Sequence, residues 1–172
     1  MRRRDEQEFV AFATGAQARL RRTAYLISGD WELASDIVQE ALIRVYVAWP
    51  RIERKGGLAA YARRCVVNVA IDIGRRRSSS ELPATHETMD RATGSVDLGV
   101  PAREALLDAL RDLPPRQRAC LVLRYFEDLS VREAAEVLGC HEGTVKSQTA
   151  RALDSLRAQT HIQDLVDEGA LS

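Results

Sequence analysis

The clearest alternation of hydrophobic and polar positions lies between Leu129 and Arg157. In its first part, apolar residues recur at helical spacing over 131–138, and Gly139 follows as a helix-terminating glycine. Ser130 and Glu133 have the spacing of a capping box, in which each side chain accepts a hydrogen bond from the other residue's backbone amide. The pattern predicts a short helix that begins after Ser130 and ends at Gly139.

A second helix is predicted from about Glu142, and its positions separate into two faces. The apolar face carries Val145, Ala152, Leu153 and Leu156, and the other face carries Gly143, Lys146, Ser147, Ala150, Arg151 and Asp154. Small, polar and basic residues suit the DNA major groove, where bulk would block approach and cations reach phosphates and guanine edges. We interpret the two helices as a helix-turn-helix whose second helix reads DNA. The alternative is a plain helical hairpin with a solvated charged face.

Three longer helices are predicted before Ser78. The first runs from about residue 5 to 27 with a break near Gly15, and residues 28–30 (Ser-Gly-Asp) end it and cap the next. The second runs over 31–49, where Pro50 stops it, and the third over about 58–76. Since strand signals are nearly absent, we expect an all-α protein.

Composition divides the chain into two small helical domains. Residues 78–100 are rich in Ser, Thr, Gly and Asp and lack apolar periodicity, which predicts a flexible linker. The expected organisation is a first domain over 1–77, the linker over 78–100, a helix-turn-helix domain over 101–160 and a tail over 161–172. Within the second domain, helices are also expected from Pro101 and over 115–126.

The second predicted helix has an unusual outer face. Among Asp36, Gln39 and Glu40 stand apolar residues, Ile43, Tyr46 and Val47. Apolar side chains set among acids on an exposed face are typical of a docking surface for a partner with basic and apolar groups. The alternative is that the first helix or the N-terminal arm covers them.

The third predicted helix and the loop before it are basic. Residues 51–57 (RIERKGG) precede a helix face with Arg63, Arg64, Asn68 and Arg75, interleaved with Val67 and Ile71. Cations can follow a nucleic-acid backbone while flat or apolar groups meet exposed bases, so this face favours single-strand binding over a merely solvated surface.

Charge and composition restrict the function. The net charge is zero, but residues 1–77 hold 15 Lys and Arg against 9 Asp and Glu. A DNA reader without an overall basic surplus suggests that a larger partner supplies much of the DNA affinity. Cys65, Cys120 and Cys140 show no metal-ligand spacing, so we expect reduced thiols and no metal or cofactor. No signal peptide or membrane-length apolar run is present, and we therefore expect a cytoplasmic protein without membrane insertion.

From about Glu8 to Arg157 the chain resembles a bacterial RNA polymerase sigma factor of the extracytoplasmic-function (ECF) group of the sigma-70 family. Residues 36–40 (DIVQE) are similar to the D-x-x-Q-[DE] element of that family. Tyr61, Asn68, Asp72 and the arginines at 75–77 match the next family block by spacing. Residues 113–118 (LPPRQR), Tyr125 and the GTVKS at 143–147 resemble the family's second domain.

The resemblance implies a transcription initiation factor, not an enzyme, which directs core RNA polymerase to promoters. It implies docking on the clamp of the largest subunit through Asp36, Gln39, Glu40, Ile43 and Val47. It implies recognition and melting of the −10 element by Arg54, Lys55, Arg64, Asn68, Asp72, Arg75 and Arg76. It implies −35 recognition by Gly143, Thr144, Lys146, Ser147, Gln148, Ala150 and Arg151. It further implies polymerase flap contacts of the second domain and an anti-sigma partner.

Some positions depart from the family pattern. Leu58 and Tyr61 stand where Phe and Trp are common, His141 replaces the usual serine cap of the reader helix, and Gln148 stands where Arg is frequent. Promoter sequence is thus the property least transferable from the family. A stand-alone helix-turn-helix regulator with a sensor or dimerisation domain is the alternative function. A small helical enzyme is disfavoured, because no nucleophile–base pair or phosphate-binding loop is present.

Overall fold

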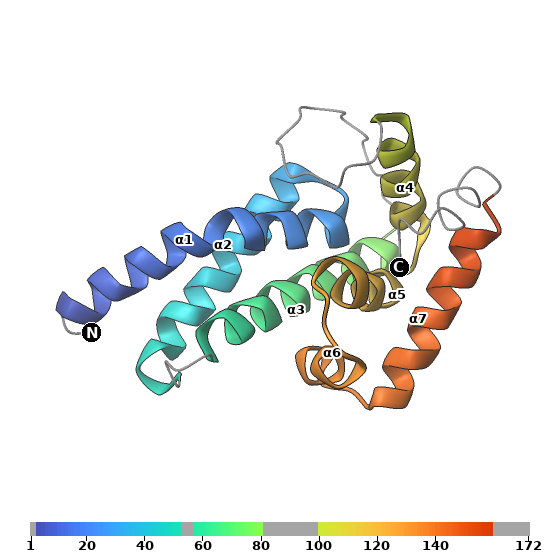
Figure 1. Cartoon of the computed structure of the whole chain (residues 1–172). Coiled ribbons are helices and arrows are strands. Elements are labelled where there is room, and N and C mark those ends of the chain that lie inside the picture. The colour runs from blue at the N-terminus through green and yellow to red at the C-terminus, as the bar shows by residue number, and fades with distance from the viewer. Residues whose placement is uncertain (1–2, 53–56, 81–99, 160–172) are drawn as a thin grey trace.

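The computed structural model describes residues 3–52, 57–80 and 100–159, and within these ranges every regular element is a helix (Figure 1). The first half contains α1 (Arg3–Ser28), α2 (Trp31–Ala48), the 3-10 turn η1 (Trp49–Arg51) and α3 (Gly57–Ser79). The second half contains α4 (Val100–Asp112), α5 (Pro115–Leu121), the π-helical turn η2 (Val122–Phe126), α6 (Val131–Leu138) and α7 (Glu142–Arg157). The all-α prediction is confirmed. Most of the predicted linker over 78–100 and the tail over 161–172 lie outside the described residues.

The predicted break near Gly15 is wrong, because α1 is a single helix through that position. A glycine inside a helix costs about 1 kcal/mol relative to alanine. On α1, Phe9 and Phe12 before the glycine and Leu20 after it pack against the same hydrophobic core. Burial of these side chains on both sides outweighs the local preference of one glycine.

The junctions between the first helices follow the sequence prediction. Gly29 has a left-handed φ of 77°, and the Asp30 side chain accepts a hydrogen bond from the Leu33 amide at 2.9 Å. Asp30 therefore caps α2, as expected. At the other end of α2, Trp49 is buried and its ring meets Phe9 and Phe12, with ring centroids 5.3 and 5.8 Å apart.

Helix α3 is covered on two sides. It lies against α1 and α2 on one side and against α5 and α6 on the other (Figure 1). Val67 and Ile71, expected to interleave with exposed cations, are only 0% and 6% exposed. That expectation is wrong, because residues from the second half cover the face on which it placed these two side chains.

The helix-turn-helix is built as predicted. The capping box is formed, with Ser130 N donating to Glu133 Oε2 at 2.8 Å and Glu133 N donating to Ser130 Oγ at 3.2 Å. Gly139 ends α6 with a left-handed φ of 62°. A separate core joins α7 to α4 and α5, formed by Leu106, Ala109, Leu110, Leu113, Leu121, Ala152 and Leu156.

Candidate functional surfaces

The outer face of α2 is open as predicted. Asp36, Gln39 and Glu40 are exposed, and Ile43 and Val47 are 63% and 73% exposed. Large aliphatic side chains at this level of exposure are unfavourable in water and mark a surface that another protein can cover.

The alternative, in which the first helix covers these side chains, is wrong for Ile43 and Val47. Helix α1 reaches only the edge of this face, where Phe9 packs on Tyr46 with ring centroids 5.0 Å apart. We call Asp36, Gln39, Glu40, Ile43 and Val47 the α2 surface.

Predicted nucleic-acid contacts on α3 form one stripe along the helix. Arg64, Asn68 and Asp72 follow each other at four-residue intervals, and Arg75 and Arg76 continue the row. Four of the five are exposed and Asn68 is half-buried. Arg54 and Lys55 lie outside the described residues. We call the five described residues the α3 stripe.

Helix α7 separates its faces as the sequence predicted. Val145, Ala152 and Leu156 are fully buried and Leu153 is half-buried. The predicted contact residues are exposed at Gly143, Lys146, Ser147, Ala150 and Arg151, and half-buried at Thr144 and Gln148. We call these seven residues the α7 surface.

His141 is a weak cap for the reader helix, as expected. It occupies the N-cap position of α7, but its side chain makes no capping hydrogen bond. The amide donors at the start of α7 are thus left without a side-chain acceptor at the cap.

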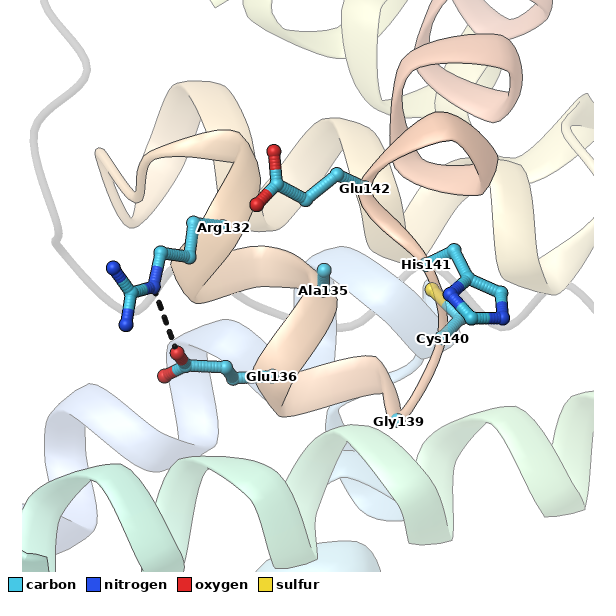
Figure 2. A pocket seen from close by; sticks show the side chains of 7 residues that line it. All are labelled: Arg132, Ala135, Glu136, Gly139, Cys140, His141 and Glu142. Carbon is cyan, nitrogen blue, oxygen red and sulfur yellow. Dashed lines mark hydrogen bonds and ion pairs between the residues drawn. The ribbon is translucent and has the colours of Figure 1, made fainter.

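An open hollow lies beside the turn of the helix-turn-helix (Figure 2). It is lined by Arg132, Ala135, Glu136, Gly139, Cys140, His141 and Glu142. The Arg132 guanidinium is already paired with Glu136 at 3.3 Å, and Glu142 adds a second carboxylate. Two carboxylates against one guanidinium disfavour a phosphate, so this hollow is unsuited to a DNA backbone contact.

The cysteines are free thiols. Burial raises the pKa of Cys65, and burial raises the pKa of Cys120 to about 11, so both thiols stay protonated at neutral pH. A protonated, buried thiol is a poor nucleophile. In the part of the chain that the structure describes, no three His, Cys, Asp or Glu residues are grouped to hold a metal ion, and no helix is long and apolar enough to cross a membrane.

Sequence reasoning missed the side chains that join the halves. Glu127, in the turn after η2, binds residues of α1 and α3, and Arg118 of α5 donates to the Ile27 carbonyl at 2.6 Å. The acidic Glu-Asp pair at 127–128 gave no sign of this role, because acids in turns are normally solvated.

Comparison with known proteins identifies the family of both halves of the chain. Residues 13–80 match the sigma-70 region 2 family, and residues 103–156 match sigma-70, region 4. The RNA polymerase sigma-E factor of Streptomyces coelicolor is 38% identical over 162 residues, covering 92% of this chain and 89% of that protein. The sigma-E factor of Streptomyces avermitilis is 36% identical over 158 residues, covering 92% of this chain and 88% of that protein.

Solved structures of sigma factors share the fold of this chain. The sigma factor RpoE of Bartonella quintana, in complex with the anti-sigma factor NepR, matches with a TM-score of 0.68 and 25% identity. The match covers 88% of this chain and 96% of RpoE. The sigma factor SigJ of Mycobacterium tuberculosis shares the fold, with a TM-score of 0.60 and 23% identity.

A helical protein whose two halves match the promoter-recognition regions 2 and 4, in that order, is a transcription initiation factor and not an enzyme. The chain belongs to the ECF group of the sigma-70 family of RNA polymerase sigma factors. It binds core RNA polymerase and directs it to promoters through their −35 and −10 elements. The stand-alone regulator is therefore not its function.

Proposed function

We propose a division of these tasks among the three surfaces of the chain. Residues 1–77 act as the unit that docks on polymerase and opens the −10 element, and residues 101–160 act as the −35 reader, with 78–100 linking them. The observation that supports this most directly is the α2 surface, where Ile43 and Val47 stand open beside Gln39.

Docking on the clamp of the largest polymerase subunit would bury Ile43 and Val47. Removing such side chains from water contributes roughly 1.5–3 kcal/mol each when burial is complete. Asp36 and Glu40 complement a basic partner, and the Gln39 amide supplies hydrogen bonds of fixed direction. The second half contacts the flap region of the polymerase.

The α3 stripe engages the −10 element. Arg64, Arg75 and Arg76 follow the backbone, and Asn68 offers an amide to a base edge. Arg54 and Lys55, which lie outside the described residues, are assigned to the same task from the sequence alone. Such contacts form with the open strand and offset the free energy of unstacking.

The α7 surface enters the major groove at the −35 element. Gly143, Ser147 and Ala150 are small enough to let the helix approach, while Lys146 and Arg151 reach phosphates or guanine. Thr144 and Gln148 border this contact, and Gln148 offers an amide suited to adenine.

The working environment follows from these tasks. A protein that meets core polymerase on DNA operates in the cytoplasm, without inserting into the membrane. The Bartonella quintana relative was solved with an anti-sigma factor, which supports such a regulatory partner for this chain. Both polymerase-facing halves would be covered in that complex.

The test of the proposal is run-off transcription on a library of genomic promoters with purified core polymerase. We expect specific starts only when this protein is added, and alignment of those promoters will define both elements. Gln39→Ala combined with Ile43→Ala should abolish co-elution with core polymerase on gel filtration.

Gln17→Ala, at an exposed position of α1, is the matched control and should assemble normally. Normal assembly of the double variant would overturn the assignment of the α2 surface. Circular dichroism melting of both variants separates a docking defect from loss of fold.

A further inference from the structure

Arg44 is an exposed cation of α2 that lies outside the α2 surface, the α3 stripe and the α7 surface. Its guanidinium pairs with the Glu40 carboxylate four residues earlier, and the two side chains are 44% and 51% exposed. An exposed ion pair of this spacing contributes little to stability, because water screens both charges. A phosphate can therefore take the place of the carboxylate, since arginine binds both anions through the same donors.

The position of Arg44 relative to α3 follows from its effect on Cys65. Helices α2 and α3 pack against each other, and Cys65 of α3 is only 7% exposed. Burial raises the pKa of this thiol, and the charges of Arg44 and Arg64 oppose that rise. A cation has such an effect only at short range, so guanidinium groups from two helices lie close to one residue of α3. Arg44 therefore borders the start of the α3 stripe, of which Arg64 is the first residue.

The cations of this region gather around one face of α3. Arg64, Arg75 and Arg76 of the α3 stripe are exposed, and Arg44 adds a charge beside them from the neighbouring helix. Cations held together on one surface raise the local concentration of anions. They favour a polyanion that contacts several of them at once and releases its counterions. A DNA strand, with a phosphate at every nucleotide, is such a polyanion.

The charge of Arg44 suits DNA better than the docking partner of α2. Asp36 and Glu40 give the α2 surface an acidic character, which complements a partner with basic groups. A cation at the border of that surface is mismatched to the same partner. On its other side, Arg44 adjoins the cations of the α3 stripe, which it reinforces.

We propose that Arg44 binds a backbone phosphate of the open −10 strand, so that the strand-binding surface extends from α3 onto α2. The inference rests on the proposed function, since it assumes that the α3 stripe engages the −10 element. A phosphate contact supplies affinity and fixes the position of the strand, while base recognition remains with the α3 stripe.

Three variants separate the charge of Arg44 from its shape. Arg44→Gln removes the charge and keeps much of the side chain, whereas Arg44→Lys keeps the charge. Arg22→Gln removes a charge from an exposed position of α1 and is the matched control. Melting curves by circular dichroism establish that all three variants are folded. Each should co-elute with core polymerase on gel filtration as the wild type does.

The measurement is the salt dependence of strand binding by the holoenzyme. Fluorescence anisotropy gives the affinity for the labelled single non-template strand of a promoter recovered by run-off transcription. Each phosphate contact on a single strand contributes about 0.7 to the slope of log affinity against log salt concentration. Arg44→Gln should lower the slope by about 0.7, so between about 50 and 200 mM salt its affinity should fall about 2.6-fold less than that of the wild type. Arg44→Lys and Arg22→Gln should keep the wild-type slope.

Three outcomes would overturn the proposal. An unchanged slope with Arg44→Gln would exclude the phosphate contact. An equal change with Arg22→Gln would mean that the effect is one of overall charge. Loss of co-elution with core polymerase in Arg44→Gln would assign Arg44 to the docking surface instead.

Arg64→Gln, measured in the same way, separates this inference from the proposed function. The expected result is a lower slope in both Arg44→Gln and Arg64→Gln. A lower slope with Arg64→Gln alone would retain the α3 stripe and remove Arg44 from the strand-binding surface. An unchanged slope in both variants would remove the assignment of the α3 stripe itself, and the inference with it.

Discussion

At the scale of single residues, Arg151 is the side chain of the α7 surface best suited to read a base. It is exposed at the C-terminal end of that surface, and arginine can donate two hydrogen bonds to guanine. Arg151→Ala should weaken promoter binding by the holoenzyme by roughly 1–3 kcal/mol and relax specificity at one base pair. Binding to a set of −35 point variants measures both effects.

Arg157→Ala is the control for this prediction. Arg157 is exposed at the end of α7, where it pairs with Asp154 at 3.4 Å. It carries the same charge but lies outside the α7 surface. Equal loss of affinity in both variants would assign Arg151 a general electrostatic role instead of base reading.

Thr149 is a second residue whose side chain allows a specific prediction. It is 9% exposed on the inner face of α7, and its hydroxyl has no hydrogen-bond partner. A buried polar group without a partner costs roughly 1–3 kcal/mol, and valine has the same shape without that group. Thr149→Val should therefore raise the free energy of unfolding by about 1 kcal/mol, measured by urea denaturation. A destabilised variant would mean that the Thr149 hydroxyl has a hydrogen-bond partner in solution.

At the scale of elements, the capping box of α6 links stability to pH. Hydrogen bonds from Ser130, the backbone amide first, lower the pKa of Glu133. The pKa of a glutamate in the unfolded chain is about 4.3. Between the two pKa values, the folded state therefore binds fewer protons than the unfolded chain. The contribution of ionised Glu133 to stability is fully present above the pKa of the unfolded chain. It is lost as the pH falls through the lower pKa of the folded state.

Glu133→Gln tests this linkage, because glutamine can still accept the capping bond but does not titrate. The stability difference between wild type and variant should be largest near neutral pH and shrink below about pH 4. Urea denaturation across that range measures it. A difference that stays constant with pH would exclude the ionised Glu133 as the source.

Elements held by local interactions could be predicted from the sequence. The caps at Asp30, Ser130 and Gly139 depend on neighbours within a few residues, so their sequence signature is complete. The two faces of α7 follow from periodicity in the same way. Gly15 is the exception among local signals, because the packing of α1 outweighs a propensity of about 1 kcal/mol.

At the scale of the whole molecule, sequence reasoning failed where distant residues meet. Val67 and Ile71 lie on a face of α3 that α1 and α2 leave open. The second half of the chain packs on that face and buries it. Glu127 lies 64 positions from Arg63 and 108 from Arg19, a distance over which periodicity carries no information. The exposed positions on α2 and α7 could be predicted from the sequence, while the contacts that join the two halves could not.

Promoter opening can be tested at the C-terminal end of α3. Arg75 and Arg76 are exposed near the C-terminal end of α3. Arg75→Ala with Arg76→Ala should impair strand opening more than formation of the closed complex, because their contacts are made chiefly to the melted strand. Permanganate footprinting measures opening, and filter binding to the duplex promoter measures the closed complex.

Arg22→Ala with Arg19→Ala is unsuitable as the control for that experiment, because Arg19 binds Glu127. Arg22→Ala with Arg4→Ala removes two exposed arginines of α1 and leaves the ion pairs of Glu127 intact. Both double variants lower the net charge equally, so a general electrostatic effect would reduce duplex binding to the same extent in each. A selective loss of permanganate reactivity with Arg75 and Arg76 replaced would place strand opening on α3, whereas equal loss of binding and opening would argue against that role.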